Sequence, residues 1–518
     1  MSATVCIELQ PLGKRLHLSA GAGLQEALFQ AGVEFPCGAR ARCKGCRVRV
    51  LRGEAPPTAE DRKFFPEREL AEGWRLACRM TATDGLTIEA AQWDAHVLGD
   101  DRRFDFIARK GLGVAIDLGT TTVAAQLLDL EAGRVIGVRT ALNDQARHGG
   151  DIMSRIEFGM QPEGLATLRK LVRDQLGTMV SELIAERADG GGAGSDVAAT
   201  VSDIVIVGNT AMHHIVGGLD VGALAHTPFH PVTARRLAFR ASEFGWTELA
   251  GATVHVLPCL GGFVGGDILA GILATGMADS PDLGVLIDLG TNGELVVGNR
   301  DRMLCASTAA GPAFEGARIS MGMRAATGAI AAVARDADGS LACKVLGGGP
   351  PRGLCGSGLV DAVAVGLDAG WILPNGRFQK SGPIPLSGPV TLAQADVREL
   401  QLAKGAIAAG LGCLLARWGA ELGDVRKVWL AGAFGNYISR VSARRIGLLP
   451  FPLERVDASG NTALLGAKMA LCQQLWTGDD FAGLLGRVEH VPLNEDPSFE
   501  DGFIGEMRFP DPPTAGRV

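Results

Sequence analysis

Hydrophobic and polar residues alternate along the first ninety residues of the chain, which is the pattern of half-buried β-strands. The segments TVCIEL (4–9) and KRLHLS (14–19) have this two-residue period, so we expect them to form paired strands. The segment GLQEALFQAG (23–32) has helical spacing and ends at a glycine, which predicts a short helix. The strand-like segments CRVRVL (46–51), RLACRM (75–80) and LTIEA (86–90) complete a small β-rich unit.

The pattern changes over residues 91–112. This stretch includes GDDRRFDFIARKG, which is charged and has few branched apolar residues, and we interpret it as a linker, with a solvated helix as the alternative. From residue 113 onwards, strands rich in Val and Ile alternate with tight glycine turns and alanine-rich helices. That alternation predicts α/β architecture.

An internal repeat divides the α/β region. GVAIDLGT (113–120) returns as GVLIDLGT (284–291), with seven of the eight positions identical. A weaker pair, DIVIVGN (203–209) and KVWLAGAFGN (427–436), consists of apolar strands that run into a Gly/Asn turn. The spacing is too long for a solenoid and predicts two similar α/β halves. The predicted boundaries are 1–90 for the β-rich domain, 91–112 for the linker, 113–283 for the first half and 284–518 for the second half.

Composition excludes several partner classes. The 518 residues suggest two to four domains. Aromatic residues make up 5% of the chain, the net charge is −7, and no long Lys/Arg run occurs, so we expect no nucleic-acid partner. The N-terminus lacks the apolar core of a signal peptide, and the apolar run AIAAGLGCLLA (406–416) is too short to span a bilayer. We therefore expect a cytoplasmic protein that does not enter the membrane.

Four of the eleven cysteines have a meaningful spacing. Cys37, Cys43, Cys46 and Cys78 form C-x5-C-x2-C-x31-C, and four thiolates of this kind hold a [2Fe–2S] cluster. The tight trio needs unusual backbone angles and little side-chain bulk, which Gly38, Ala39, Ala41 and Gly45 provide. Structural zinc and unliganded thiols stay open as alternatives, although zinc sites usually use two C-x2-C pairs. The other seven are interpreted as small buried hydrophobes: Cys6, Cys259, Cys305, Cys343, Cys355, Cys413 and Cys472.

This arrangement resembles the plant-type ferredoxins, which have a β-grasp fold. One extra residue between the first two cysteines makes it more similar to the adrenodoxin-like branch. The resemblance implies a one-electron carrier that receives its electron from a donor reductase. Arg40, Arg42 and Arg47 stand where many ferredoxins have acidic residues, which implies a different donor or a different docking face.

The repeated strand and turn carry the candidate chemistry of the α/β region. IDLGTTT (116–122) and IDLGTNGE (287–294) each place an Asp at the end of a strand, followed by a glycine turn and hydroxyl or amide side chains. Backbone N–H groups and hydroxyls of such turns can donate to phosphate oxygens, and the Asp can hold a Mg²⁺-bound water. An ordinary strand-turn is the alternative for each loop alone. The candidates are Asp117 and Asp288 as catalytic residues, Gly119, Thr120, Thr121 and Thr122 in the first loop, and Gly290, Thr291 and Asn292 in the second.

The duplicated loops resemble the phosphate 1 and phosphate 2 loops of the actin-like ATPase superfamily, whose two halves have a ribonuclease H-like fold. The resemblance implies that ATP and Mg²⁺ bind between the halves. WLAGAFGNYI (429–438) is similar to the adenosine segment of that superfamily, with Gly432, Ala433 and Phe434 beside the nucleoside. It departs from the pattern at Ala431, where many members have glycine.

Four further segments have open interpretations. AAGPAFEG (309–316) is a loop that can line the cleft, and LCGSGLVDA (354–362) predicts a Gly/Ser turn that opens a helix, beside the nucleotide or only as a cap. We interpret Asp151 as a helix cap, and His213 and His214 as buried or partly exposed side chains rather than metal ligands.

A ferredoxin-like module followed by an actin-like ATPase resembles the reductive activators of corrinoid proteins. That resemblance implies ATP-dependent transfer of one electron, which returns cob(II)amide to cob(I)amide on a corrinoid protein of a methyltransferase system or on a methionine synthase. It also implies a possible homodimer. Plant-type clusters have potentials near about −400 mV, so reduction of cobalt is uphill, and a coupling of ~1–3 kcal/mol shifts a one-electron potential by roughly 40–130 mV.

Three other functions were weighed. A small-molecule kinase with a redox-regulatory ferredoxin domain predicts steady phosphorylation beside Asp117 or Asp288. A redox-sensing chaperone would need a substrate-binding β-domain and a helical lid, which the sequence does not suggest. The ATP-dependent activators of radical dehydratases bridge a [4Fe–4S] cluster across a dimer, and the N-terminal four-cysteine set argues against that class.

Overall fold

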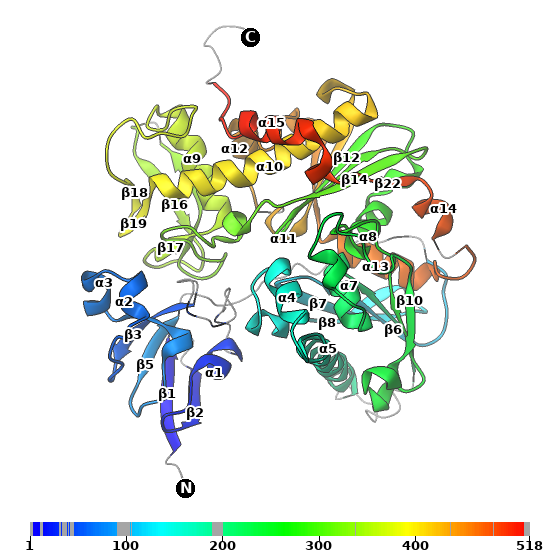
Figure 1. Ribbon diagram of the computed structural model, residues 1–518, viewed down its shortest axis with the longest axis horizontal. Helices are drawn as coiled ribbons and strands as arrows, with labels where there is room; N and C mark the ends of the chain where they lie inside the picture. Colours follow the sequence, from blue (N-terminus) through cyan, green and yellow to red (C-terminus); the bar gives the residue numbers. More distant parts are fainter. Residues whose placement is uncertain are drawn as a thin grey trace. The chain divides into compact units, whose positions relative to one another are not determined.

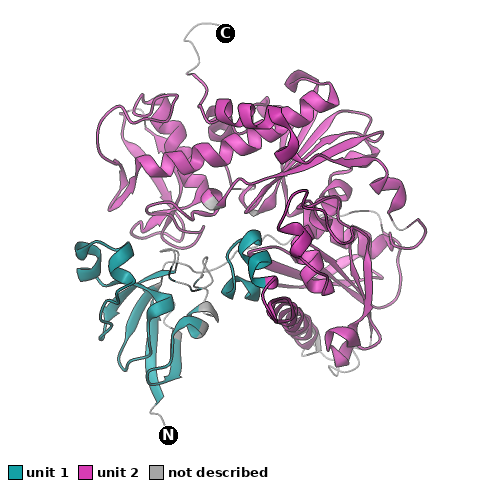
Figure 2. Cartoon of the chain, in the orientation of Figure 1, with its two compact units in different colours: residues 1–95, 144–158 teal, residues 96–143, 159–518 magenta. Residues whose placement is uncertain are grey.

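The computed structural model describes residues 4–10, 14–30, 33, 39, 41, 46–90, 104, 106–188, 200–336, 338–435, 437–479 and 481–511. They form two compact units (Figure 2): unit 1 comprises residues 1–95 and 144–158, and unit 2 comprises residues 96–143 and 159–518. Each unit is described by itself.

Strands and helices alternate along most of the chain (Figure 1). The strands are β1 Thr4–Gln10, β2 Lys14–Ser19, β3 Arg47–Arg52, β4 Trp74–Leu76, β5 Thr87–Ala90, β6 Leu112–Leu118, β7 Thr122–Asp129, β8 Arg134–Leu142, β9 Val201–Val207, β10 Leu237–Arg240, β11 Thr253–Val256, β12 Gly284–Leu289, β13 Gly293–Gly298, β14 Met303–Thr308, β15 Ala329–Arg335, β16 Leu341–Val345, β17 Gly353–Leu354, β18 Ile384–Ser387, β19 Val390–Leu392, β20 Lys427–Ala431, β21 Val456–Gly460 and β22 Val488–His490. The α-helices are α1 Gln25–Gln30, α2 Asp61–Phe64, α3 Glu67–Ala71, α4 Ile152–Gly159, α5 Gly164–Ala188, α7 Thr210–Gly217, α8 Gly266–Thr275, α9 Gly356–Asp368, α10 Gln394–Trp418, α11 Gly432–Gly435, α12 Arg440–Arg445, α13 Thr462–Gln473, α14 Ala482–Leu485 and α15 Pro497–Glu506.

Unit 1 contains a five-stranded mixed sheet in the order β2-β1-β5-β3-β4. β1 pairs antiparallel with β2 and parallel with β5, while β3 lies antiparallel to both β5 and β4. Alternate side chains of β1, such as Ile7 and Leu9, are fully buried, as the two-residue period predicts. One predicted strand was partly wrong: RLACRM is a strand only as far as Leu76, and Ala77–Arg79 form a 3-10 helix, η1. The strand ends there because the chain turns, with the Met80 N–H donating to the Ala77 carbonyl at 3.2 Å.

Unit 2 contains two six-stranded sheets, and five strands of each share one topology. In the first sheet, β6-β7-β8 form an antiparallel meander and β9 and β11 follow in parallel on the other side of β6. In the second sheet, β12-β13-β14 form the meander, with β20 and β21 in parallel on the other side of β12. The strong repeat therefore occupies equivalent strands β6 and β12, and the weak repeat occupies their neighbours β9 and β20. This duplication confirms the prediction of two ribonuclease H-like halves.

The core between the two sheets contains helices α8 and α13, which lie side by side (Figure 1). It includes Ala115 of β6 and Leu286 of β12. Because side chains alternate along a strand, Asp117 and Asp288 project from these same inner faces, two residues beyond Ala115 and Leu286. The helices touch backbone to backbone, since a Cβ added at Gly466 would lie 2.0 Å from the Ala270 carbonyl oxygen.

Helix α10 belongs to the outer core of the second half. Among the described residues it is the one helix long and apolar enough, by length and composition, to cross a membrane. Its most apolar window is 78% buried inside the protein.

Candidate functional site

The described part of the cysteine loop has the backbone that a tight wrapping turn requires. Ala39 and Ala41 both have left-handed conformations, with φ of 58° and 51°. Such angles are uncommon for residues with a side chain and are least costly for small ones, as the sequence predicted. Cys46 is buried directly before β3, and Cys78 is half-buried in η1. Cys37 and Cys43 lie outside the described residues.

A buried carboxylate supports the segment that carries Cys78. Asp61 accepts hydrogen bonds from the Leu76 N–H at 2.7 Å and from the Thr58 N–H and hydroxyl at 2.7 and 2.8 Å. The neighbouring Arg75 donates to the carbonyls of residues 55, 70 and 74. These bonds fix the backbone immediately before Cys78, so the thiol has a defined position relative to Cys46. Two of the four predicted cluster ligands, Cys46 and Cys78, therefore lie on backbone that hydrogen bonds support.

The two predicted phosphate loops each turn directly after the repeated glycine, and they meet each other. The Gly119 N–H donates to the Thr122 carbonyl at 3.1 Å, and the Gly290 N–H donates to the Asn292 carbonyl at 3.0 Å. The hydroxyls of Thr121 and Thr291 lie 3.3 Å apart. The structure therefore brings together one hydroxyl from each half, although Thr291 is the repeat equivalent of Thr120 and not of Thr121.

Two buried asparagines that the sequence reasoning did not single out hold the first loop. Asn143 donates from its side chain to the Gly119 carbonyl and from its backbone to the Thr121 carbonyl, both at 2.9 Å. Asn209 donates to the Thr120 hydroxyl oxygen at 2.9 Å. Thr120 is thus part of the supporting framework, while Thr121 is the half-buried threonine that faces the other half.

Four carboxyl groups gather around the ends of β6 and β12. Burial raises the pKa of Asp117 to about 6, that of Asp288 to about 7 and that of Asp267 to about 8, and for Asp288 and Asp267 the neighbouring carboxylates raise it further. Burial also raises the pKa of Glu294 well above its usual range. Among the described residues, no lysine or arginine forms an ion pair with the three aspartates, so the negative charge at this point is uncompensated.

Helices α8 and α13, which lie between the sheets, each begin beside the aspartate of the opposite half. Asn461, the cap of α13 in the second half, donates to Asp117 in the first half at 2.8 Å. Asp267, in the first turn of α8 in the first half, has Asp288 of the second half as its strongest charged neighbour. Each half thus supplies a helix start to the other half's aspartate. Sequence reasoning missed Asn461 and Asp267, whose only local signal was an Asn or Gly-Asp step before a helix. It did not single out Glu294, although this residue ends the repeated segment IDLGTNGE (287–294).

Within the predicted adenosine segment, helix α11 begins at Gly432, a position where the structure requires glycine. Gly432 has φ of 85°, and an added Cβ would lie 2.5 Å from the Leu289 carbonyl oxygen and 2.6 Å from Asp288 Oδ1. Phe434 stacks on Phe314 with ring centroids 4.7 Å apart. The Ala433 side chain and Asn436 lie outside the described residues. A cavity directly beyond the segment is lined by Ile438, Ser439, Arg440, Val441, Leu453 and Ala458.

Replacement of Gly432 by alanine is expected to weaken nucleotide binding and to lower stability. The left-handed φ and the contact with Asp288 together add about 1–3 kcal/mol of strain. Calorimetric binding of a non-hydrolysable ATP analogue and thermal unfolding measure the two effects. Gly412→Ala, on helix α10 where an added Cβ meets no atom within 4 Å, is the matched control and leaves both unchanged or slightly stabilises. If Gly432→Ala and Gly412→Ala bound the ATP analogue equally well and were equally stable, the assignment of Gly432 to the nucleotide site would be contradicted.

The structure places the segments whose interpretation the sequence left open. Glu315 of AAGPAFEG lies at the phosphate loops, because its carboxylate accepts a hydrogen bond from Thr291 at 2.6 Å. LCGSGLVDA opens helix α9 as predicted, and an added Cβ at Gly356 would meet Phe434 at 2.9 Å. Asp151 accepts from the Ser154 N–H at 2.8 Å at the start of α4, as predicted for a cap. His213 and His214 are buried, and of the seven scattered cysteines Cys6 and Cys343 are only half-buried.

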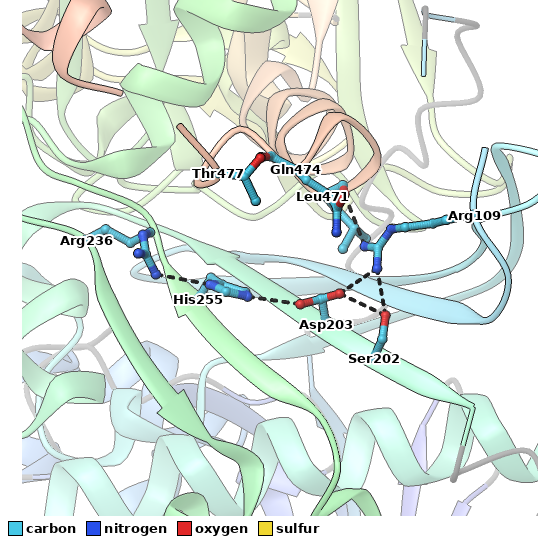
Figure 3. A network of polar contacts seen from close by, with 8 residues as sticks. All are labelled: Arg109, Ser202, Asp203, Arg236, His255, Leu471, Gln474 and Thr477. Carbon is cyan, nitrogen blue, oxygen red and sulfur yellow. Dashed lines mark hydrogen bonds and ion pairs between the residues drawn. The ribbon is translucent and has the colours of Figure 1, made fainter. Parts of the chain in front are cut away.

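A buried polar network lies at the far end of α13 (Figure 3). Arg109 donates to Asp203 at 2.6 Å, to Ser202 at 2.8 Å and to the Leu471 carbonyl at 3.3 Å. Asp203 also accepts from His255 Nε2 at 3.1 Å, and His255 Nδ1 accepts from Arg236 at 3.2 Å. The network joins the segment before β6 and strands β9 and β11 to the end of a second-half helix.

Comparison with known proteins covers nearly the whole chain. Residues 7–83 match the family described as 2Fe-2S iron-sulfur cluster binding domain, residues 112–280 match the RACo middle region, and residues 282–515 match the C-terminal domain of RACo, the ASKHA domain. The corrinoid activation enzyme RamQ of Eubacterium limosum is 33% identical over 451 residues, which cover 80% of this chain and 74% of the relative. The Co(II) methylated amine-specific corrinoid protein reductase of Methanosarcina barkeri is 26% identical over 435 residues, 77% of each chain. A solved reductive activator for corrinoid, iron-sulfur protein aligns with a TM-score of 0.68 and 27% identity over 98% of both chains.

Proposed function

Because this chain belongs to the family of reductive activators of corrinoid proteins, we propose that it uses ATP to return the cobalt of a partner corrinoid protein from cob(II)amide to cob(I)amide. The observation that carries the proposal is the meeting of Thr121 and Thr291 beside three uncompensated aspartates, in a chain that also carries a ferredoxin-type cysteine set. The cysteine set serves electron transfer, and the threonines and aspartates serve nucleotide binding.

Unit 1 holds the electron carrier. Cys37, Cys43, Cys46 and Cys78 are the ligands of a [2Fe–2S] cluster, which when bound supplies a one-electron carrier. The left-handed backbone at Ala39 and Ala41 and the support of Cys78 by Asp61 favour this assignment. A separate reductase supplies the electron.

The nucleotide site uses both halves of unit 2. Thr121, Thr122, Thr291 and Asn292 donate to the β- and γ-phosphates, while Gly119 and Gly290 close the two turns that present them. The nucleoside lies along Gly432, Ala433 and Phe434, next to the cavity beyond that segment. Asp117 and Asp288 hold Mg²⁺ through its waters, and the uncompensated burial of these carboxylates supports a divalent cation at this point.

Nucleotide binding acts on electron transfer through the two halves. A ligand shifts a conformational equilibrium only by its differential affinity for the two states. The loops belong to different halves, so phosphate bound between them favours the arrangement in which the halves approach. Closure of the halves is the two-state element that couples ATP to reduction of the cobalt. The partner is a corrinoid protein of a methyltransferase system or a methionine synthase, and the activator works in the cytoplasm as a homodimer.

The proposal is tested by mixing reduced protein with the cognate cob(II)amide protein under anaerobic conditions. Cob(I)amide absorbance is expected only when Mg-ATP is present. Reduction that is independent of ATP, or no reduction by a protein with a reduced cluster, would contradict the proposal.

Asp288→Asn is expected to lower ATP hydrolysis about 100-fold or more and to raise the Mg²⁺ concentration needed for half-maximal rate. The reason is that a bound cation contributes several kcal/mol to charge stabilisation, and an amide holds it poorly. Hydrolysis measured across a Mg²⁺ titration gives both values. Asp279→Asn, at an exposed position in the 3-10 helix Met277–Asp279, is the control. An unchanged Mg²⁺ requirement in Asp288→Asn would remove this residue from the cation site.

A further inference from the structure

Glu315 bridges the two phosphate loops. It ends the 3-10 helix Pro312–Glu315, and its Oε1 accepts a hydrogen bond from the Thr291 hydroxyl at 2.6 Å. Its Oε2 accepts from the Thr121 hydroxyl at 3.5 Å, and the two hydroxyls are 3.3 Å from each other. Among the described residues, it is the carboxylate that contacts a hydroxyl from each half.

The backbone around Glu315 is held firmly. On one side, Phe314 is buried and stacked on Phe434. On the other side, Gly316 has φ of 78°, and an added Cβ there would lie 2.3 Å from the Met323 carbonyl oxygen. The carboxylate is therefore presented to the loops by a rigid turn, which is the condition for a precisely placed catalytic group.

Nucleotide binding changes what this carboxylate contacts. Each threonine hydroxyl has one proton to donate, and in the described structure both donate toward Glu315. When the γ-phosphate takes those protons, the carboxylate loses donors and stands beside another anion. An ionised carboxylate accepts hydrogen bonds, and a water molecule beside the phosphate can donate one to it.

The other acidic residues at this point have different surroundings. Asp117 accepts from Asn461, and Asp267 and Glu294 lie among the carboxyl groups at the strand ends and helix starts. Among the described residues, none of these three contacts a loop hydroxyl, whereas Glu315 contacts two. The cation and the attacking water are thus served by separate carboxylates.

We propose that Glu315 is the catalytic residue that orients the attacking water and takes its proton during ATP hydrolysis, an assignment that rests on the proposed function. The water oxygen forms a bond to the γ-phosphorus while the bond from that phosphorus to the β,γ-bridging oxygen breaks. The electron pair of the broken bond stays on ADP. The proton of the water passes to the Glu315 carboxylate and then to solvent, so no other reactant is needed.

The test is Glu315→Gln, which keeps the shape of the side chain and removes the base. We expect the single-turnover rate of ATP hydrolysis to fall by about 10²–10⁴-fold, the usual contribution of a general base. We expect the Kd of a non-hydrolysable ATP analogue to stay within about threefold, because the threonines and backbone N–H groups are intact. Acid quenching of the isolated complex is expected to release ATP from the variant and ADP from the wild type. Glu248→Gln, at an exposed position in the 3-10 helix Thr247–Leu249, is the matched control.

Each outcome is decisive. Hydrolysis by Glu315→Gln within threefold of the wild type would overturn the assignment. A loss of nucleotide affinity that matches the loss of turnover would also overturn the assignment, because it would show that Glu315 stabilises the loops and does not act as a base. Glu315→Asp separates these cases further, since a shorter carboxylate restores part of the rate only if the charge acts on water. A wild-type protein that binds ATP and never hydrolyses it would remove the premise, and so the proposed ATPase itself would fail.

Discussion

Serine at Cys46 or Cys78 is expected to abolish reduction of the corrinoid partner while ATP hydrolysis continues near the wild-type rate. A [2Fe–2S] cluster needs four thiolates, and a serine hydroxyl is a poor substitute for a soft ligand. The two cysteines belong to unit 1 and the phosphate loops belong to unit 2, so the loss is confined to electron transfer. Iron and sulfide content, the paramagnetic signal of the reduced cluster and cob(I)amide absorbance measure it.

Cys6→Ser is the matched control for both cysteine variants. Cys6 is a half-buried cysteine on strand β1 of the same unit, outside the spaced set. It is expected to keep two irons per chain after anaerobic reconstitution. Full iron content in Cys46→Ser or Cys78→Ser would contradict the ligand assignment, and one zinc without iron in the wild type would favour the zinc alternative.

Asp203→Asn is expected to lower the free energy of unfolding by about 3–5 kcal/mol, the usual cost of breaking a buried ion pair from one side. Asp203 is only 14% exposed and is contacted by Arg109, His255 and Ser202. The neutral amide leaves the Arg109 guanidinium without its counter-charge, while the Ser202 and Leu471 contacts of that guanidinium persist. Denaturant unfolding of the variant and the wild type measures the difference.

The difference in unfolding free energy between the wild type and Asp203→Asn is expected to become smaller as the pH falls. Although burial opposes it, hydrogen bonds from His255, Arg109 and Ser202 lower the pKa of Asp203 to about 2. A carboxyl whose folded pKa lies below its unfolded value of about 3.9 stabilises the folded state at higher pH and loses that contribution as the pH falls. The gap between wild type and Asp203→Asn is therefore expected to be constant above about pH 4 and to narrow toward pH 2.

An exposed ion pair provides the control for the Asp203 prediction. Lys170 and Asp174 pair one helical turn apart on α5, with side chains 76% and 58% exposed. Asp174→Asn is expected to cost no more than about 0.5 kcal/mol, the usual value for such pairs. A similar cost in Asp203→Asn would mean that the network in Figure 3 contributes little to stability.

The sequence predicted the architecture because the duplicated segment is local and strongly patterned. One repeated strand and turn places Asp117 and Asp288 on inner faces, since alternation along a strand decides which side chains face the core. The sheet of unit 1 follows from the same two-residue period. The ends of the elements were harder to predict. RLACRM continued the strand pattern, but a 3-10 turn, closed by the bond from the Met80 N–H to the Ala77 carbonyl, ends the strand before Cys78.

The supporting residues of the site could not be predicted in the same way. Asn143, Asn461 and Asp267 lie far from the loops along the chain. Asn143 reaches the first loop from the end of β8, and Asn461 and Asp267 reach the site at the starts of the helices that lie between the sheets. No local period marks them, because an Asn or Asp at a helix start reads as an ordinary cap. The ligand roles of Cys37 and Cys43, the roles of the loop residues and the domain boundaries stay predictions.

The contact of Gly466 with the Ala270 carbonyl sets how closely α8 and α13 pack. With no side chain between the two backbones, neither helix has room to move closer to the other. Asn461, which donates to Asp117, lies five residues before Gly466, about 7 Å along the helix axis. Any residue larger than glycine at position 466 would therefore separate the two helices close to the hydrogen bond that joins the two halves at Asp117.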